Sequence, residues 1–139
     1  MIQRIQSVLL LLSSLGFLSL FKFPLAGSVE AGGVRFQDQL LNLNDHAGLM
    51  GAAIAGGILA FGSIFLFKRR GLQIGLSYLS IIPALAIFGL AHYFTKEAPI
   101  STHYLTGMFI PVVSGLLSLG AILFIKKDEK LVRSMDRLR

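Results

Sequence analysis

The sequence predicts an all-α integral membrane protein, a four-helix bundle that crosses the bilayer up-down-up-down. Of its 139 residues, 54% are hydrophobic and 14% are charged, and the mean hydropathy is +0.73; soluble domains are about 25% charged. Four apolar stretches are each long enough to cross a membrane, which takes a helix of about 20 residues. Most connections between them are short, which favours antiparallel neighbours. We therefore predict a single membrane domain over residues 1–139.

The first predicted helix covers residues 5–26. The stretch "PLAGSVEA", which begins near the end of this helix, offers small residues for a signal-peptide cleavage site. The single Arg4 is a weak basic region, however, and the apolar run is longer than that of most signal peptides. A retained helix is therefore the favoured interpretation, with Lys22 near its end extending to the membrane interface.

The second predicted helix, residues 47–67, has small side chains around most of its circumference. Small residues four apart let helices approach closely in membranes. This pattern indicates either packing inside the bundle or a docking face for a second protein or a second copy. The small residues are Gly51, Ala52, Ala53, Ala55, Gly56 and Gly57.

The third and fourth predicted helices cover residues 72–94 and 104–125. Each contains a proline, Pro83 and Pro111, which we expect to be tolerated as a kink. Small residues also recur in the fourth helix, at Ser114, Gly115 and Ser118, where they indicate packing.

Two segments lie outside these helices. The outer loop, residues 27–46, is half apolar, and two structures remain open for it: a segment on the bilayer surface or a short strand. The tail, residues 126–139, has Leu131, Val132, Met135 and Leu138 at helical spacing. This amphipathic tail either continues the last helix or lies on the inner leaflet. It serves as a topology anchor or as a docking helix for a cytoplasmic partner.

The distribution of basic residues predicts the orientation. Lys22, Arg35 and Lys96 fall on one side of the predicted spans. The other ten of the thirteen fall on the opposite side: Arg4, Lys68, Arg69, Arg70, Lys126, Lys127, Lys130, Arg133, Arg137 and Arg139. Because cytoplasmic loops carry an excess of Lys and Arg, both termini are predicted to be cytoplasmic. Loops 27–46 and 95–103 are then outside.

The polar inventory argues against several chemistries. The chain has no cysteine, so thiol mechanisms are excluded. No Asp, Glu, Lys or Arg lies in the middle of a predicted span, whereas proton-coupled transporters and ion pumps need an ionisable group there. We predict no enzymatic activity and no catalytic residue.

All three histidines fall at the outer face: His46, His92 and His103, with Asp45 at the same level. Two or three histidines and a carboxylate are an adequate ligand set for zinc or copper, and two histidines suffice as axial ligands of a haem. The plainer interpretation is that Asp45 or Asn44 caps the second helix and the histidines lie at the interface.

The two ends of the chain, "MIQRIQSVLLLL" and "LVRSMDRLR", resemble a bacterial family typical of Bacteroidota, domain of unknown function 4293. The resemblance implies an inner-membrane protein with four helices, and it implies no activity, cofactor or catalytic residue. It draws attention to the cytoplasmic ends as contact sites, and the candidate residues are Gln3, Arg4, Gln6, Arg133, Asp136 and Arg137.

Together these observations predict a non-enzymatic inner-membrane protein that acts through helix-helix and tail contacts, as a small accessory or assembly subunit. Its partners are the lipid bilayer and a membrane protein, which is another protein or a second copy. We predict no cofactor and no nucleic acid. The alternative is a metal-, haem- or small-ligand-binding membrane protein that uses the outer histidines.

Overall fold

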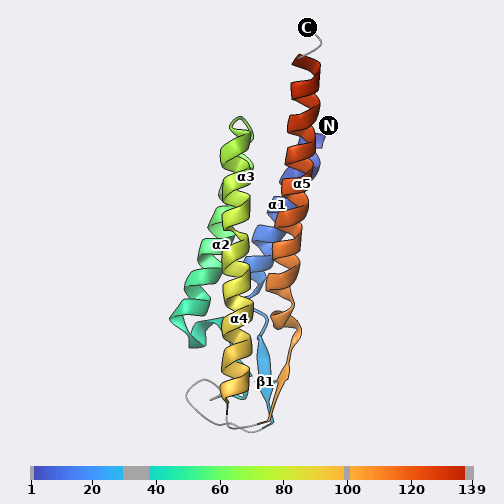
Figure 1. Ribbon diagram of the computed structural model, residues 1–139. Coiled ribbons are helices and arrows are strands. Elements are labelled where there is room, and N and C mark those ends of the chain that lie inside the picture. The colour runs from blue at the N-terminus through green and yellow to red at the C-terminus, as the bar shows by residue number, and fades with distance from the viewer. Residues whose placement is uncertain (1, 30–37, 99–100, 137–139) are drawn as a thin grey trace.

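The computed structural model describes residues 2–29, 38–98 and 101–136 (Figure 1). The side chains of residues 2–4, 133, 135 and 136 are not described. Within this part the chain is mostly helical, with short strands at one end. The helices are α1 (Ile2–Ser19), α2 (Ala47–Phe65), α3 (Arg70–Leu79), α4 (Ile81–Glu97) and α5 (Ile110–Asp136), and the strands are β1 (Ala26–Ser28), β2 (Leu40–Leu41) and β3 (Thr102–Tyr104).

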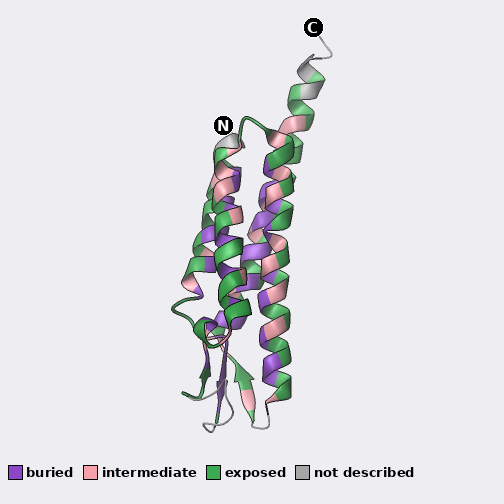
Figure 2. Cartoon of the chain, turned by 90° about the vertical axis from the view of Figure 1, so that its left-hand side faces the viewer, coloured by how far each residue is buried: buried purple, intermediate pink, exposed green. Residues whose placement is uncertain are grey.

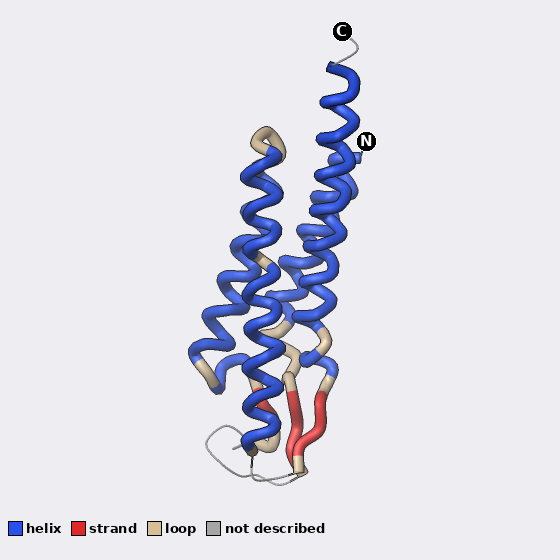
Figure 3. Tube along the Cα trace, viewed as in Figure 1, coloured by secondary structure: helices blue, strands red, loops and turns tan. Residues whose placement is uncertain are grey.

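The described helices form columns that lie side by side (Figures 1 and 3). Only Ser80 separates α3 from α4, so these two helices make one column. Helix α1 packs on α2 and α5, and the α3/α4 column packs on the same two helices from the other side. We call the packed helices the helical body. Both chain ends lie at its terminus end, and the strands lie at the opposite end, the sheet end.

Three helical segments of the described chain are long and apolar enough to cross a membrane: Ala47–Phe65, Arg70–Glu97 and Thr106–Val132. The apolar part of α1, Ile5–Ser19, is shorter than these segments. A helix of fifteen residues extends about 22 Å, less than the hydrocarbon core of about 30 Å. Three of the four predicted spans therefore have the length to cross a membrane in the structure, and the first, in α1, is shorter.

Helix α1 ends at Ser19, and the predicted end at residue 26 is wrong. Pro24 has no backbone N–H to donate and disfavours helical backbone at the residue before it, so the chain leaves the helix ahead of it. The apolar run nevertheless continues past the helix, because Leu25 and Ala26 are fully buried at the sheet end. Apolarity alone therefore did not distinguish the helix from the strand that follows.

The described strands form a three-stranded antiparallel sheet in the order β2-β1-β3. The prediction of an all-α fold missed this sheet. Gly27 of β1 pairs with Leu40 of β2 and with His103 of β3, so the sheet connects the outer loop to the connection between α4 and α5. Of the two structures open for the outer loop, a short strand is the one observed; residues 30–37 of that loop lie outside the described residues.

Helix α5 is displaced from its predicted range of 104–125. Tyr104 belongs to β3, a 3₁₀ turn covers Thr106–Met108, and the helix then runs without a break from Ile110 to Asp136. The tail therefore continues the last helix as far as Asp136. Pro111 lies in the first turn of α5, where the missing N–H has no partner to lose, so the expected interior kink is absent there. Pro83 lies inside the α3/α4 column, and its missing N–H removes a helical hydrogen bond close to the interruption at Ser80.

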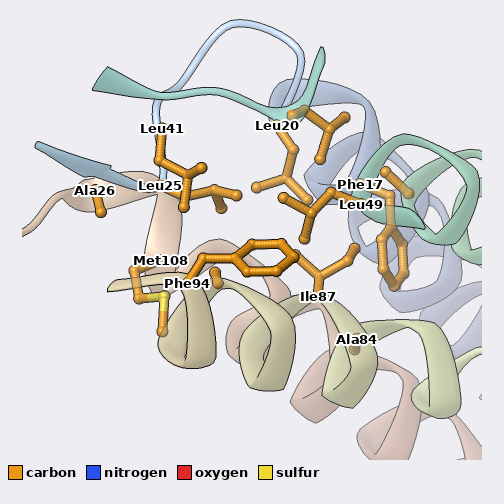
Figure 4. Close-up of a cluster of buried hydrophobic side chains, with 13 residues drawn as sticks. Phe17, Leu20, Leu25, Ala26, Leu41, Leu49, Ala84, Ile87, Phe94 and Met108 are labelled. Atoms are coloured by element: carbon orange, nitrogen blue, oxygen red, sulfur yellow. The ribbon is translucent and has the colours of Figure 1, made fainter. Parts of the chain in front are cut away.

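The apolar core lies at the sheet end of the helical body. Phe17 from α1, Leu49 from α2 and Ile87 from α4 are each fully buried, and they point toward one another (Figure 4). Leu25 and Met108 extend this cluster to the sheet. Burying each such side chain stabilises the fold by about 1.5–3 kcal/mol. The outward helix faces, in contrast, are largely exposed (Figure 2).

Candidate functional site

His46 is the residue that caps α2. Its backbone is extended, with φ −146° and ψ 123°, and its Nδ1 accepts a hydrogen bond from the Gly48 N–H at 3.1 Å. The prediction that Asp45 or Asn44 caps this helix is wrong. Asp45 ends a 3₁₀ turn, and its carboxylate accepts the Asn42 N–H at 2.6 Å. Helix α2 begins at Ala47, as predicted, so the residue directly before it is His46, and its imidazole takes the capping role predicted for the carboxylate.

The imidazole of His46 also packs against Phe94, with 4.8 Å between the ring centroids. Phe94 is almost completely buried in the core, so this contact joins the start of α2 to the end of α4. His46 thus has a structural role that accounts for both its hydrogen-bonding atom and its ring.

His92 and His103 lie at the same end of the molecule but have different neighbours. His92 stacks between Phe88 and Tyr104, at centroid distances of 6.5 and 5.9 Å, and its Nδ1 lies 2.7 Å from the Tyr104 hydroxyl. His103, on β3, lies against Gly27 across the strand pair. Both histidines are exposed.

The structure therefore does not bring the predicted metal ligands together. His46, His92, His103 and Asp45 are all described, yet within residues 2–29, 38–98 and 101–136 no three His, Asp or Glu side chains are grouped as a metal ion needs. Each of the four side chains contacts a different part of the sheet end.

The His46 cap provides a test of this arrangement. We expect His46→Ala to lower the free energy of unfolding by about 1 kcal/mol or somewhat more, because the cap and the ring contact with Phe94 are both lost. Asp45→Ala, the matched control, removes only an exposed bond and should cost less. Thermal unfolding in detergent micelles compares the two variants. A larger loss for Asp45→Ala would contradict the assignment of the cap.

The six small residues of α2 divide into two groups. Gly56 and Gly57 are buried against Phe17 of α1, and Ala53 is buried in the core. Gly51 and Ala55 are exposed, Ala52 is half-buried, and a Cβ on Gly51 would meet nothing within 4 Å. The first group packs within the chain, while the exposed pair is available to something outside it.

An apolar groove lies between α4 and α5, with a volume of about 330 Å³. It is lined by Ala84, Leu85, Phe88, Pro111, Val112 and Leu116 among other apolar residues. Small-molecule sites combine an apolar wall with a few placed polar groups that orient the ligand. This groove has almost no polar lining and includes none of the three histidines, so it is not the predicted small-ligand site at the outer histidines.

At the terminus end, polar contacts attach α5 to α3. The Arg70 guanidinium lies 3.1 Å from the Asp128 carboxylate, and Lys126 donates to the Tyr78 hydroxyl at 2.8 Å. Of the predicted cytoplasmic contact residues, Arg4, Arg133 and Asp136 have undescribed side chains, and Arg137 lies outside the described residues.

Beyond Asp128, α5 projects past the rest of the helical body (Figure 1). The projecting part carries two exposed apolar side chains, Leu131 at 45% and Val132 at 36% exposure. An ordered helix that presents apolar side chains away from its own core is suited to contact with another protein.

A column of buried polar side chains inside the helical body was not predicted. Its members are Gln6, Ser13, Ser14, Ser63, Gln73, Ser77, Ser80, Ser114 and Ser118. Gln6 was expected at the cytoplasmic end as a contact residue, and its burial corrects that expectation; Ser114 and Ser118 were interpreted as packing only. A signal was nevertheless present, because Gln73, Ser77 and Ser80 follow the spacing of one helix face.

The family model described as Domain of unknown function (DUF4293) matches residues 2–138. The chain belongs to the DUF4293 family. The match covers nearly the whole chain, so the resemblance observed at the two termini is confirmed. Comparisons with curated proteins and with solved structures gave no match. The DUF4293 description names no activity.

Proposed function

We propose that this DUF4293 chain is a small accessory or assembly subunit of the bacterial inner membrane, a four-helix bundle that acts through protein contacts and without catalysis. Among the described residues, three helical segments have the length and composition of membrane spans: α2, the α3/α4 column and α5. In this proposal α1 completes the bundle, together with the turn that leads to the sheet. The sheet end faces outward, and both termini are cytoplasmic.

The proposed orientation rests on where the basic residues lie. Lys68 and Arg69 lie in the turn between α2 and α3, and Lys126, Lys127 and Lys130 lie on the last part of α5, so all five are at the terminus end. Lys22 and Lys96 lie toward the sheet end, after α1 and at the end of α4. Cytoplasmic loops of membrane proteins carry an excess of Lys and Arg. The excess of basic residues at the terminus end therefore supports a cytoplasmic location for that end.

A pair of reporter fusions tests this orientation. We expect a reporter placed after Arg139 to be active only in the cytoplasm and one inserted at Gly33 to be active only outside it. Fluorescent-protein and alkaline-phosphatase fusions at both positions measure this directly. An external C-terminus would overturn the proposed orientation and, with it, the assignment of the projecting end of α5 to the cytoplasm.

The observation that carries the proposed function is the projection of α5. Its base is fixed by the Arg70–Asp128 ion pair, while Leu131 and Val132 remain exposed beyond it. Exposed apolar side chains on a helix can enter a groove on a partner, which is a common mode of recognition. We therefore assign the contact with a cytoplasmic partner, or with the cytoplasmic part of a membrane partner, to this projecting segment.

The proposed contact is tested by replacing its apolar side chains. We expect the double variant Leu131→Glu, Val132→Glu to lose a partner that co-purifies stoichiometrically with the wild-type chain from native membranes in mild detergent. Lys130→Glu is the matched control, because it changes the net charge by the same amount without removing an apolar side chain. Equal partner recovery with both variants, or a wild-type chain that purifies alone, would contradict the proposal.

A further inference from the structure

The buried polar side chains are arranged in layers along the helical body. In the middle layer, Ser118 Oγ of α5 lies 2.9 Å from Ser13 Oγ of α1 and 3.1 Å from Ser80 Oγ, between α3 and α4. Ser13 also donates to the Ser114 carbonyl at 2.9 Å. These contacts join α1 to the α3/α4 column through α5. The hydroxyls of this layer are therefore satisfied within the protein, apart from Ser114 Oγ.

A second layer follows from the helix geometry. Gln6 and Gln73 stand seven residues before Ser13 and Ser80, in α1 and α3, which both begin at the terminus end. Seven residues make two turns and about 10.5 Å, so both glutamines lie on the inner face one heptad nearer that end. We call this the glutamine layer.

Helix α2 contributes Ser63 to the glutamine layer. Further along the body, Ser14 of α1 donates to the Gly57 carbonyl of α2 at 3.3 Å, which fixes the level of these two antiparallel helices. Ser63 lies six residues nearer the terminus end on α2, and it is fully buried. Its hydroxyl donates to the Ala60 carbonyl at 2.7 Å, so Ser63 is satisfied by its own helix.

The glutamines, in contrast, have polar atoms that lack partners. Gln73 is fully buried, and neither its Oε1 nor its Nε2 has a hydrogen-bond partner; Gln6 is 3% exposed, and its Oε1 has none. A buried polar group left without a partner costs about 1–3 kcal/mol. A primary amide offers an acceptor oxygen and two N–H donors, so these atoms can bind a molecule that both donates and accepts.

We propose that the glutamine layer is an internal binding site for water. A water molecule can donate to the glutamine oxygens and accept from Gln73 Nε2, which satisfies the atoms that the protein leaves unpaired. The amide and hydroxyl groups that define the layer are uncharged, so a charged ligand would lack a counter-charge there. The glutamine layer is separate from the proposed contact surface at Leu131 and Val132, and the water site does not depend on the proposed function.

The absence of native cysteine makes the site testable by thiol oxidation. A thiol reacts as the thiolate, which forms readily in contact with water and poorly in apolar surroundings. In purified full-length protein, we expect hydrogen peroxide, which is close to water in size and hydrogen bonding, to oxidise the thiol of Ser63→Cys at least tenfold faster than that of Ala60→Cys. Ala60 is a fully buried position on the same helix and serves as the matched control.

A second substitution links the oxidation to the glutamines. Adding Gln73→Leu to Ser63→Cys should slow the modification to the rate of Ala60→Cys, because the layer is then dry. In the control that combines Gln73→Leu with Ala60→Cys, the thiol at residue 60 must still react slowly, which shows that the helices remain packed. If this thiol reacts fast, Gln73→Met is used in place of Gln73→Leu. Equal slow rates at residues 63 and 60, or a fast rate at residue 63 that Gln73→Leu leaves unchanged, would overturn the proposal.

Discussion

Gly107→Ala is expected to lower the free energy of unfolding by about 3 kcal/mol or more, at the upper end of what overpacking costs. Gly107 lies in the 3₁₀ turn before α5, and its N–H donates to the Pro24 carbonyl at 3.2 Å. A Cβ here would overlap the Pro24 carbonyl oxygen and lie 2.7 Å from the Phe23 oxygen. Because these atoms are backbone, no side-chain rotation relieves the overlap.

The control for this substitution is Gly89→Ala on α4. Gly89 is exposed, and a Cβ there would meet nothing within 4 Å. Alanine favours helix over glycine by about 1 kcal/mol, so Gly89→Ala should leave the unfolding temperature unchanged or raise it. Thermal unfolding of both variants in the same detergent gives the comparison. Equal unfolding temperatures for the two variants would show that the close approach at Gly107 is absent in solution.

The contact at Gly107 also shows where sequence reasoning reaches its limit. Helix α2 and the α3/α4 column were predicted nearly to their ends, because each combines a long apolar run with a local start or stop signal. The interruption at Ser80 within that column was not predicted. The meeting of Gly107 with Pro24, like the pairing of Gly27 with His103, joins segments far apart in the sequence. No local pattern reports such a contact, so the sheet was not predicted beyond a possible strand.

The candidate site shows the same division. From the predicted helix ends, His46, His92 and His103 were expected at the same end of the molecule, and they lie there, at the sheet end. Their separation was not predictable, because it depends on which neighbours each ring finds: Phe94 for His46, and Phe88 and Tyr104 for His92. The burial of Gln6 and Gln73 was not predicted for another reason, since the expectation for the interior of the spans concerned charged side chains only.

Gly56→Leu is the second substitution for which we expect a large effect, a loss of about 3 kcal/mol in the free energy of unfolding. A Cβ on Gly56 would lie 2.5 Å from Phe17 Cε1 and 2.7 Å from Cζ. The Phe17 ring is fully buried in the core, so it has no free space into which to move. The two helices must then separate, which also weakens the Ser14–Gly57 hydrogen bond beside them.

Gly51→Leu is the matched control on the same helix. Gly51 is exposed, and nothing lies within 4 Å of a Cβ there, so we expect no loss of stability in the isolated chain. If a partner helix docks on this exposed face, Gly51→Leu should instead reduce recovery of that partner while the unfolding temperature stays unchanged. The pair of variants thus separates packing inside the chain from contact with another protein.

A double-mutant cycle tests whether Phe17 is the cause of the effect at Gly56. Phe17→Ala alone should be destabilising by about 3–5 kcal/mol, because it leaves a cavity in the core. Combined with Gly56→Leu, the new leucine side chain can occupy part of that cavity, so the double variant should be more stable than the sum of the two losses by about 0.5–3 kcal/mol. Thermal or denaturant unfolding of the four proteins in one detergent measures this coupling. Additive losses would mean that the two residues do not meet, and the packing of α1 against α2 would then need another description.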